Sequence, residues 1–79
     1  MPDLSTDEIE RIKQSVAIKL GENIKRVRKQ RNLTQSELAS MVLSDRQYLY
    51  KIESGKVGIS VSKLYVIAAA LEIDVQDLL

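Results

Sequence analysis

The stretch from Leu33 to Lys56 reads LTQSELASMVLSDRQYLYKIESGK, and it decides the fold. Thr34 followed three residues later by Glu37 is a capping box, which predicts the start of a helix. Asp45 caps a second helix that runs to about residue 54 and is stopped by Gly55. The inward side chains that this spacing predicts are Leu38, Ala39, Val42, Leu49 and Ile52. A joint of about three residues predicts that the two helices cross steeply.

Helical spacing continues upstream of this stretch. Ser5 and Glu8 form another capping box, so a helix is expected to open at Ser5 or Thr6. Its apolar stripe, at steps of three and four, consists of Ile9, Ile12, Val16, Leu20, Ile24 and Val27. Gly21 interrupts the stripe, so residues 5–31 form either one long helix or two. Asn32 is expected to end it in the left-handed conformation.

Two further helices are expected downstream. Ser60 or Ser62 caps the first of them, whose inward residues are Leu64, Ile67, Ala68 and Leu71. Asp74 then caps a short final helix, Val75 to Leu79. The sequence has no sustained period-2 alternation and no Asn-Gly or Asp-Gly turn. These patterns predict an all-α fold of about five helices with short joints.

The composition narrows the function. The 79 residues include no cysteine and no histidine, which argues against disulfides, the usual zinc sites and most general-base chemistry. An enzyme, a metal site, a cofactor and a small-molecule ligand are therefore not expected. No apolar run reaches the length of about 20 residues that a membrane span needs. The polar, acidic start does not resemble a signal peptide, so a cytoplasmic protein is expected.

The net charge of +1 conceals a segregation of charges along the chain. Residues 1–18 carry four acidic and two basic side chains (−2), and residues 64–79 carry three acidic ones (−3). Residues 19–63 carry ten basic and four acidic side chains (+6). A basic middle between acidic ends favours a polyanionic partner, although a solvated charged surface is an equally simple interpretation.

The residues of four segments together resemble the Cro and repressor family of helix-turn-helix DNA-binding domains, also called the Xre family. These segments are residues 20–28, 33–39, 45–56 and 64–79, so the resemblance covers roughly residues 18–79. It implies a five-helix domain like that of the lambda repressor at 18–79, preceded by an N-terminal helical extension at 1–17. Asp-Arg-x-Tyr at 45–48 is also similar to the controller proteins of restriction–modification systems, a subgroup of the family.

The second helix of the pair is expected to enter the major groove of DNA. With Leu49 and Ile52 inward, its outer face carries Arg46, Gln47, Tyr50 and Lys51. Arg46 suits guanine and Gln47 suits adenine, because each side chain can make two hydrogen bonds to its base. Tyr48 is a further candidate, for a thymine methyl group or a phosphate. The expected base-contact residues are thus Arg46, Gln47, Tyr48, Tyr50 and Lys51.

The resemblance implies a phosphate contact by Gln35 and an ion pair between Arg28 and Glu53 that ties the first helix to the recognition helix. The alternative is that Arg28 and Glu53 form an ordinary surface ion pair that contributes little energy. Lys56, Lys63 and Arg28 are further candidate phosphate contacts.

Two positions within the turn depart from the family pattern. Leu43 stands where a glycine with positive φ is usual, so the turn is either strained or differently shaped. Ser44 stands where a buried apolar residue is common. The angle between the two helices is therefore less firmly predicted than the helices themselves.

The expected function is sequence-specific binding of double-stranded DNA, at a palindromic operator, by a homodimeric transcriptional regulator of the bacterial or phage nucleoid. Ile73, Val75, Leu78 and Leu79 are the expected dimer surface. Because the chain ends just after the fifth helix, no sensing domain is expected. The alternative is an antitoxin-like module that binds both DNA and a protein partner. That partner would contact the stripe of Ile9, Ile12 and Val16, which otherwise packs on its own domain.

Overall fold

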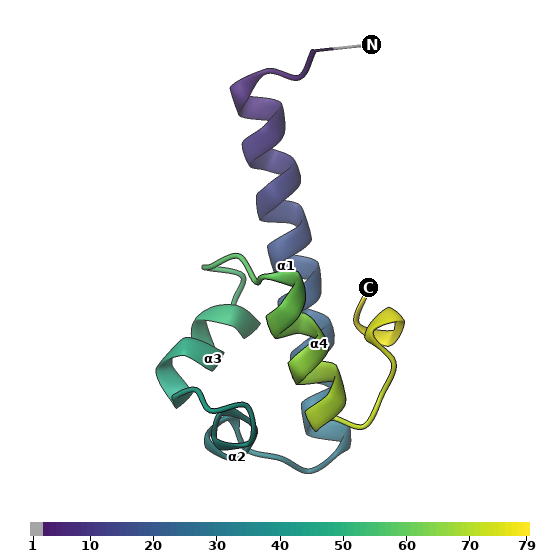
Figure 1. Ribbon diagram of the computed structural model, residues 1–79. Coiled ribbons are helices and arrows are strands. Elements are labelled where there is room, and N and C mark those ends of the chain that lie inside the picture. Colours follow the sequence, from purple (N-terminus) through teal and green to yellow (C-terminus); the bar gives the residue numbers. More distant parts are fainter. Residues whose placement is uncertain (1–2) are drawn as a thin grey trace.

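The computed structural model describes residues 3–79, and these residues form only helices, turns and loops. The elements are α1 (Thr6–Gln30), α2 (Gln35–Met41), α3 (Arg46–Glu53), α4 (Val61–Ala70) and the 3₁₀ helix η1 (Val75–Leu78). Figure 1 shows α2, α3, α4 and η1 gathered around the C-terminal half of α1. The all-α class is confirmed. The count of five helices is not confirmed: four elements are α-helices, and the expected short final helix is the 3₁₀ turn η1.

Both predicted capping boxes are present. The Ser5 hydroxyl accepts a hydrogen bond from the Glu8 N–H, and the Glu8 carboxylate accepts one from the Ser5 N–H, each at 3.1 Å. Thr34 and Glu37 form the same reciprocal pair, at 3.0 and 2.8 Å. The Ser5 N–H, and to a lesser extent the Ser5 hydroxyl, lowers the pKa of the Glu8 carboxylate below its usual range. Thr34 lowers the pKa of Glu37 in the same way. The starts of α1 and α2 therefore follow from four local residues.

The other helix starts agree with the sequence in two of three cases. The Asp45 carboxylate accepts a hydrogen bond from the Tyr48 N–H at 2.7 Å, and the Ser60 hydroxyl accepts one from the Lys63 N–H at 3.1 Å. Ser60, and not Ser62, is therefore the N-cap of α4. Asp74 occupies the N-cap position of η1, but its side chain makes no capping hydrogen bond. A 3₁₀ turn this short gains little from a cap.

α1 is one continuous helix of 25 residues that passes through Gly21 without a break. Gly21 is where the end of α3 crosses α1. A Cβ atom here would collide with the carbonyl oxygen of Ile52 and would lie 2.8 Å from that of Glu53. The glycine therefore allows a close backbone approach. α1 ends at Arg31, and Asn32 follows with the predicted positive φ of 58°.

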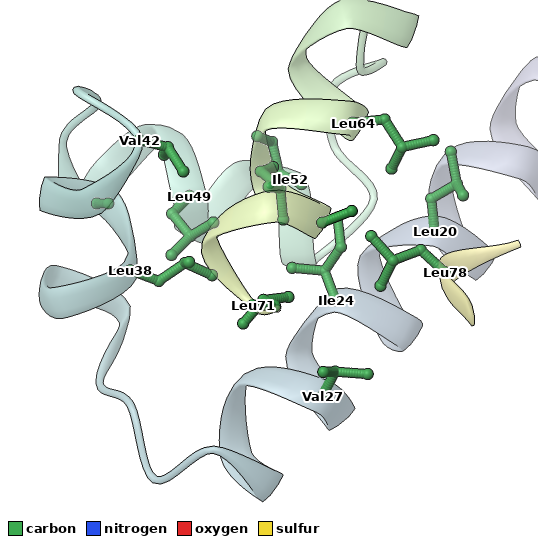
Figure 2. Close-up of a cluster of buried hydrophobic side chains, with 13 residues drawn as sticks. Leu20, Ile24, Val27, Leu38, Val42, Leu49, Ile52, Leu64, Leu71 and Leu78 are labelled. Carbon is green, nitrogen blue, oxygen red and sulfur yellow. The ribbon is translucent and has the colours of Figure 1, made fainter. Parts of the chain in front are cut away.

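The core lies between the C-terminal half of α1 and the other helices (Figure 2). All the inward residues expected in the second to fourth helices are buried. The fully buried large side chains are Ile24, Leu38, Leu49, Ile67, Leu71 and Leu78. Burying each such side chain contributes about 1.5–3 kcal/mol, so this aliphatic cluster is the main source of stability.

The expectation that the whole stripe of α1 packs on its own domain is wrong. Leu20, Ile24 and Val27 are buried, but Ile9, Ile12 and Val16 are 38%, 53% and 52% exposed. Figure 1 shows the reason: the N-terminal half of α1 extends beyond every other element. Periodicity identified the apolar face, but no other helix among residues 3–79 covers its first half.

The turn between α2 and α3 has a positive φ at Leu43, the backbone conformation that the resemblance implies for a glycine at this position. Leu43 has φ of 56° and its side chain is 96% exposed. Positive φ brings the Cβ of an L-residue close to the following carbonyl oxygen, which costs roughly 1–2 kcal/mol. Of the two alternatives that the sequence left open, the strained turn is the one that forms.

A buried ion pair fixes α3 against α1. The Arg28 guanidinium donates to both carboxylate oxygens of Glu53, at 2.6 and 3.0 Å, and to the Leu33 carbonyl oxygen at 2.7 Å. The side chains of Arg28 and Glu53 are only 8% and 2% exposed. The pair is thus not an ordinary surface ion pair. Because it is desolvated, removing one partner leaves an uncompensated buried charge.

Gly21→Ala is expected to lower the free energy of unfolding by about 1–3 kcal/mol, measured by urea denaturation. The added Cβ forces the end of α3 away from α1, and this overpacking exceeds the gain in helix propensity, which is about 1 kcal/mol. Gly58→Ala is the matched control, since a Cβ there meets nothing within 4 Å. Equal stabilities of the two variants would contradict the close approach.

Leu43→Gly is expected to raise the free energy of unfolding by about 0.5–1 kcal/mol. The relief of the strain at positive φ exceeds the conformational entropy that glycine adds to the unfolded chain. Asn32→Gly is the control at φ 58°, where asparagine is already tolerated, and it should change stability less. A destabilised Leu43→Gly variant would show that the leucine side chain has a structural role.

Glu53→Gln is expected to lower the free energy of unfolding by about 3–5 kcal/mol, because the Arg28 guanidinium stays buried without its counter-charge. Thermal and urea denaturation monitored by circular dichroism measure this loss. Glu10→Gln removes one partner of the exposed pair with Lys13, whose atoms are 3.9 Å apart, and should leave stability unchanged. A mild effect of Glu53→Gln would mean that water reaches the pair.

Candidate nucleic-acid interface

The outer face of α3 gathers four of the five residues expected to contact bases. At 100° per residue, Arg46, Gln47, Tyr50 and Lys51 fall within one sector of the helix. All four are exposed, whereas Leu49, Ile52 and Glu53 on the opposite sector are buried. The structure thus presents two cations, an amide and a phenol on one surface, with donors and acceptors suited to base edges.

Tyr48 lies at the edge of this face and not on it. Its side chain is half-buried and packs against the core. The Lys63 ammonium lies 5.7 Å from the centroid of its ring, a cation–π contact. Tyr48 therefore occupies a different environment from the four exposed residues.

Lys63 reaches the turn instead of open solvent, which counts against its expected phosphate contact. Its ammonium donates to the Ser44 hydroxyl at 2.9 Å and to the Val42 carbonyl oxygen at 3.4 Å. Val42 is the C-cap of α2, where a cation is favoured by the helix dipole. Ser44, the polar residue at an apolar position, accepts this hydrogen bond. Sequence reasoning missed the contact, because 19 residues separate the two side chains.

Lys56 is exposed just beyond the C-terminal end of α3. Its ammonium lies 5.2 Å from the centroid of the Tyr50 ring, so the two side chains stack at this end of the exposed face. Lys51 is also exposed, one helical turn from Gln47. Exposed cations therefore occur at both ends of this face, with Arg46 at the N-terminal end of α3 and Lys51 and Lys56 toward its C-terminal end and the loop after it.

Gln35 joins the ion pair at the start of α2. Its amide Nε2 donates to Glu53 Oε1 at 3.1 Å, so Glu53 receives hydrogen bonds from both α1 and α2. This contact holds the half-buried Gln35 side chain in place. The structure speaks against a phosphate contact by Arg28, because its guanidinium is buried and already donates to Glu53 and Leu33.

The expected dimer residues lie at the end of the chain in three different environments. Leu78 is fully buried in its own core, and its carbonyl oxygen accepts a hydrogen bond from the Asn23 amide of α1 at 2.9 Å. Its assignment to a dimer surface is therefore wrong. Ile73 and Val75 are half-buried and line a shallow hollow between α4 and η1, while Leu79 is exposed.

Within the described residues 3–79, no three acidic side chains are grouped closely enough to hold a metal ion. In the same part of the chain, no helix combines the length and the apolar character needed to cross a membrane.

The family model for the helix-turn-helix matches residues 24–78. The chain is 43% identical over 56 residues to the immunity repressor protein of Bacillus phage phi105. The aligned part is 71% of this chain and 39% of that repressor. It therefore spans well under half of the repressor's length. It is 34% identical over 64 residues to control protein C.MunI of a Mycoplasma species, covering 80% of the chain and 86% of C.MunI.

Among solved structures, the restriction–modification controller protein C.AhdI of Aeromonas hydrophila superposes with a TM-score of 0.80 at 27% identity. The superposition covers 84% of this chain and 96% of the controller. The short joint between α2 and α3, the exposed polar face of α3 and these matches agree with one another. The chain belongs to the helix-turn-helix family of the Xre and Cro type, the DNA-binding regulators of transcription that include phage repressors and restriction–modification control proteins.

Proposed function

We propose that the protein is a homodimeric transcriptional regulator that binds a specific palindromic sequence of double-stranded DNA, with α3 in the major groove. The observation that carries this proposal is the exposed polar face of α3, whose opposite face the buried Arg28–Glu53 pair anchors to α1. A rigid helix with a polar outer face is what direct readout of base edges requires.

Arg46 and Gln47 stand at the N-terminal end of α3, the end that approaches the bases in this class of domain. Arg46 is assigned to O6 and N7 of a guanine, and Gln47 to N6 and N7 of an adenine, each worth about 1–3 kcal/mol of discrimination. Lys51 and Tyr50 extend the contact along the groove. Tyr48 contributes through its hydroxyl at the edge of the face.

Gln35 and Lys56 are assigned to the phosphates on either side of the recognition helix. Gln35 lies at the N-terminus of α2, and its amide is oriented by Glu53. Lys56 follows Gly55 and is exposed. Such contacts set the position of the protein on the duplex without reading sequence. The basic segment 19–63 supplies the favourable field.

The homodimer is assigned to the surface around the hollow between α4 and η1. Ile73 and Val75 line this hollow together with Tyr65, and Leu79 is exposed nearby in sequence. A two-fold axis there makes the same apolar patch face itself. Such a dimer on the bacterial or phage nucleoid reads two half-sites about one helical turn apart, and occupancy of the operator regulates transcription.

A second candidate function is favoured by the exposure of Ile9, Ile12 and Val16. The protein is then an antitoxin-like module that binds another protein through α1 and also binds DNA. A stable complex with a protein of different sequence, lost in Ile12→Glu, would support this candidate.

Arg46→Ala and Lys56→Ala are expected to weaken DNA binding in different ways. Arg46→Ala should relax the preference at one base position per half-site, because it removes a base contact. Lys56→Ala should weaken all duplexes alike and reduce the slope of log affinity against log salt by about 1, because it removes a phosphate contact. Site selection from random duplexes followed by anisotropy titrations at several salt concentrations measures both effects.

Arg11→Ala is the control for these two variants, since this exposed arginine lies in the N-terminal half of α1 and does not line the groove beside the loop 54–59 that carries Lys56. Identical behaviour of the Arg46 and Lys56 variants would contradict the assigned roles. An affinity that stays constant from low to high salt would contradict DNA binding itself.

A further inference from the structure

The N-terminal half of α1, residues 6–17, forms an arm with an unpartnered apolar face. Ile9, Ile12 and Val16 follow at steps of three and four and therefore lie on one face of the arm. Each is at least 38% exposed. Isolated apolar side chains on a surface are ordinary, but three on one face of a projecting helix form a stripe that water solvates poorly.

The apolar stripe continues into a groove beside the domain. This groove lies between α1 and the loop 54–59 and is lined by Ile12, Val16, Leu20, Val57 and Ile59 among others. An occupant that lies along the arm therefore also meets apolar side chains of the loop. A second helix has the length and shape to follow both surfaces.

The charges of the arm show which occupant fits. Asp7, Glu8 and Glu10 lie in the first two turns and give −3. Arg11 and Lys13 in the rest of the arm, with Lys19 just beyond it on the same helix, give +3. A parallel copy of this helix places like charges side by side. An antiparallel copy places the acidic end beside the basic end at both ends of the pair.

We propose that the arms of two copies of this chain pair antiparallel through the stripe of Ile9, Ile12 and Val16. Ile12 then lies at the two-fold axis and faces Ile12 of the other copy, and Ile9 packs against Val16. Glu8 and Lys19 flank the stripe on the same side, so the pairing brings each Glu8 beside the Lys19 of the other copy. The contact is isologous, with the same patch used twice.

This second interface goes beyond the proposed DNA-binding dimer. The pairing itself does not depend on that dimer, and only its role as a link between operator-bound dimers rests on the proposed function. The arm and the α4/η1 surface belong to different elements. A chain with two separate isologous interfaces assembles into a closed tetramer or an open array. Pairing of arms thus provides a link between two operator-bound dimers, made by protein contacts alone.

Disulfide cross-linking of the full chain tests the pairing, because the natural sequence has no cysteine. Ile12→Cys should cross-link to itself under mild oxidation. Ile9→Cys and Val16→Cys should each stay uncross-linked alone and should cross-link to one another when mixed, as resolved by mass spectrometry. Arg11→Cys, on the opposite face of the arm, is the control. Absence of the mixed product, or equal cross-linking of Arg11→Cys, overturns the proposal.

Sedimentation equilibrium supplies an independent measurement. Ile12→Glu should weaken association of the arms by about tenfold or more, while circular dichroism and affinity for a single operator stay unchanged. Glu8→Lys and Lys19→Glu should each weaken association, and the double variant should restore it. Unchanged association of Ile12→Glu overturns the proposal, as does cross-linking that requires a different protein. Neither result bears on DNA binding by α3.

Discussion

The geometry of this domain depends on one buried carboxylate, that of Glu53 at the end of α3. Arg28 from α1 donates two hydrogen bonds to it and Gln35 from α2 donates a third. A helix of eight residues does not hold its shape alone in water, so α3 takes its orientation from its neighbours. Desolvating both charges offsets much of their attraction. The pair therefore contributes more to the unique placement of α3 than to net stability.

The same face of α1 provides a second constraint on α3. Gly21 and Arg28 are seven residues apart, so they lie on one side of the helix two turns from each other. Gly21 admits the carbonyl oxygens of Ile52 and Glu53, and this approach brings the Glu53 side chain within reach of Arg28. Gly21, which has no side chain, and Arg28, which carries a charge, therefore together hold the end of α3 against α1. The exposed face of α3 points outward because its opposite face is held at both of these points.

Local sequence was sufficient to predict most of the helices and the exposed face of α3. Capping residues such as Ser5, Thr34 and Asp45 act within three residues, and Leu49 and Ile52 set which side of α3 is buried. Long-range contacts were not predictable in the same way. Leu78 is buried because Asn23, 55 residues earlier, binds its carbonyl oxygen and because the core has room for its side chain. Periodicity also cannot show that nothing covers Ile12, since coverage depends on the path of the other helices.

The turn between α2 and α3 shows how a local departure from the family pattern is compensated. The Ser44 N–H donates to the Ala39 carbonyl oxygen at 2.8 Å, a bond that requires positive φ at Leu43. Lys63 then crosses from α4 to bind both the Ser44 hydroxyl and the carbonyl oxygen of Val42, the C-cap of α2. An apolar residue at position 44 would hold the turn by burial. Here a hydrogen bond from a distant lysine holds it, and the turn forms with a leucine in place of glycine and a serine in place of an apolar residue.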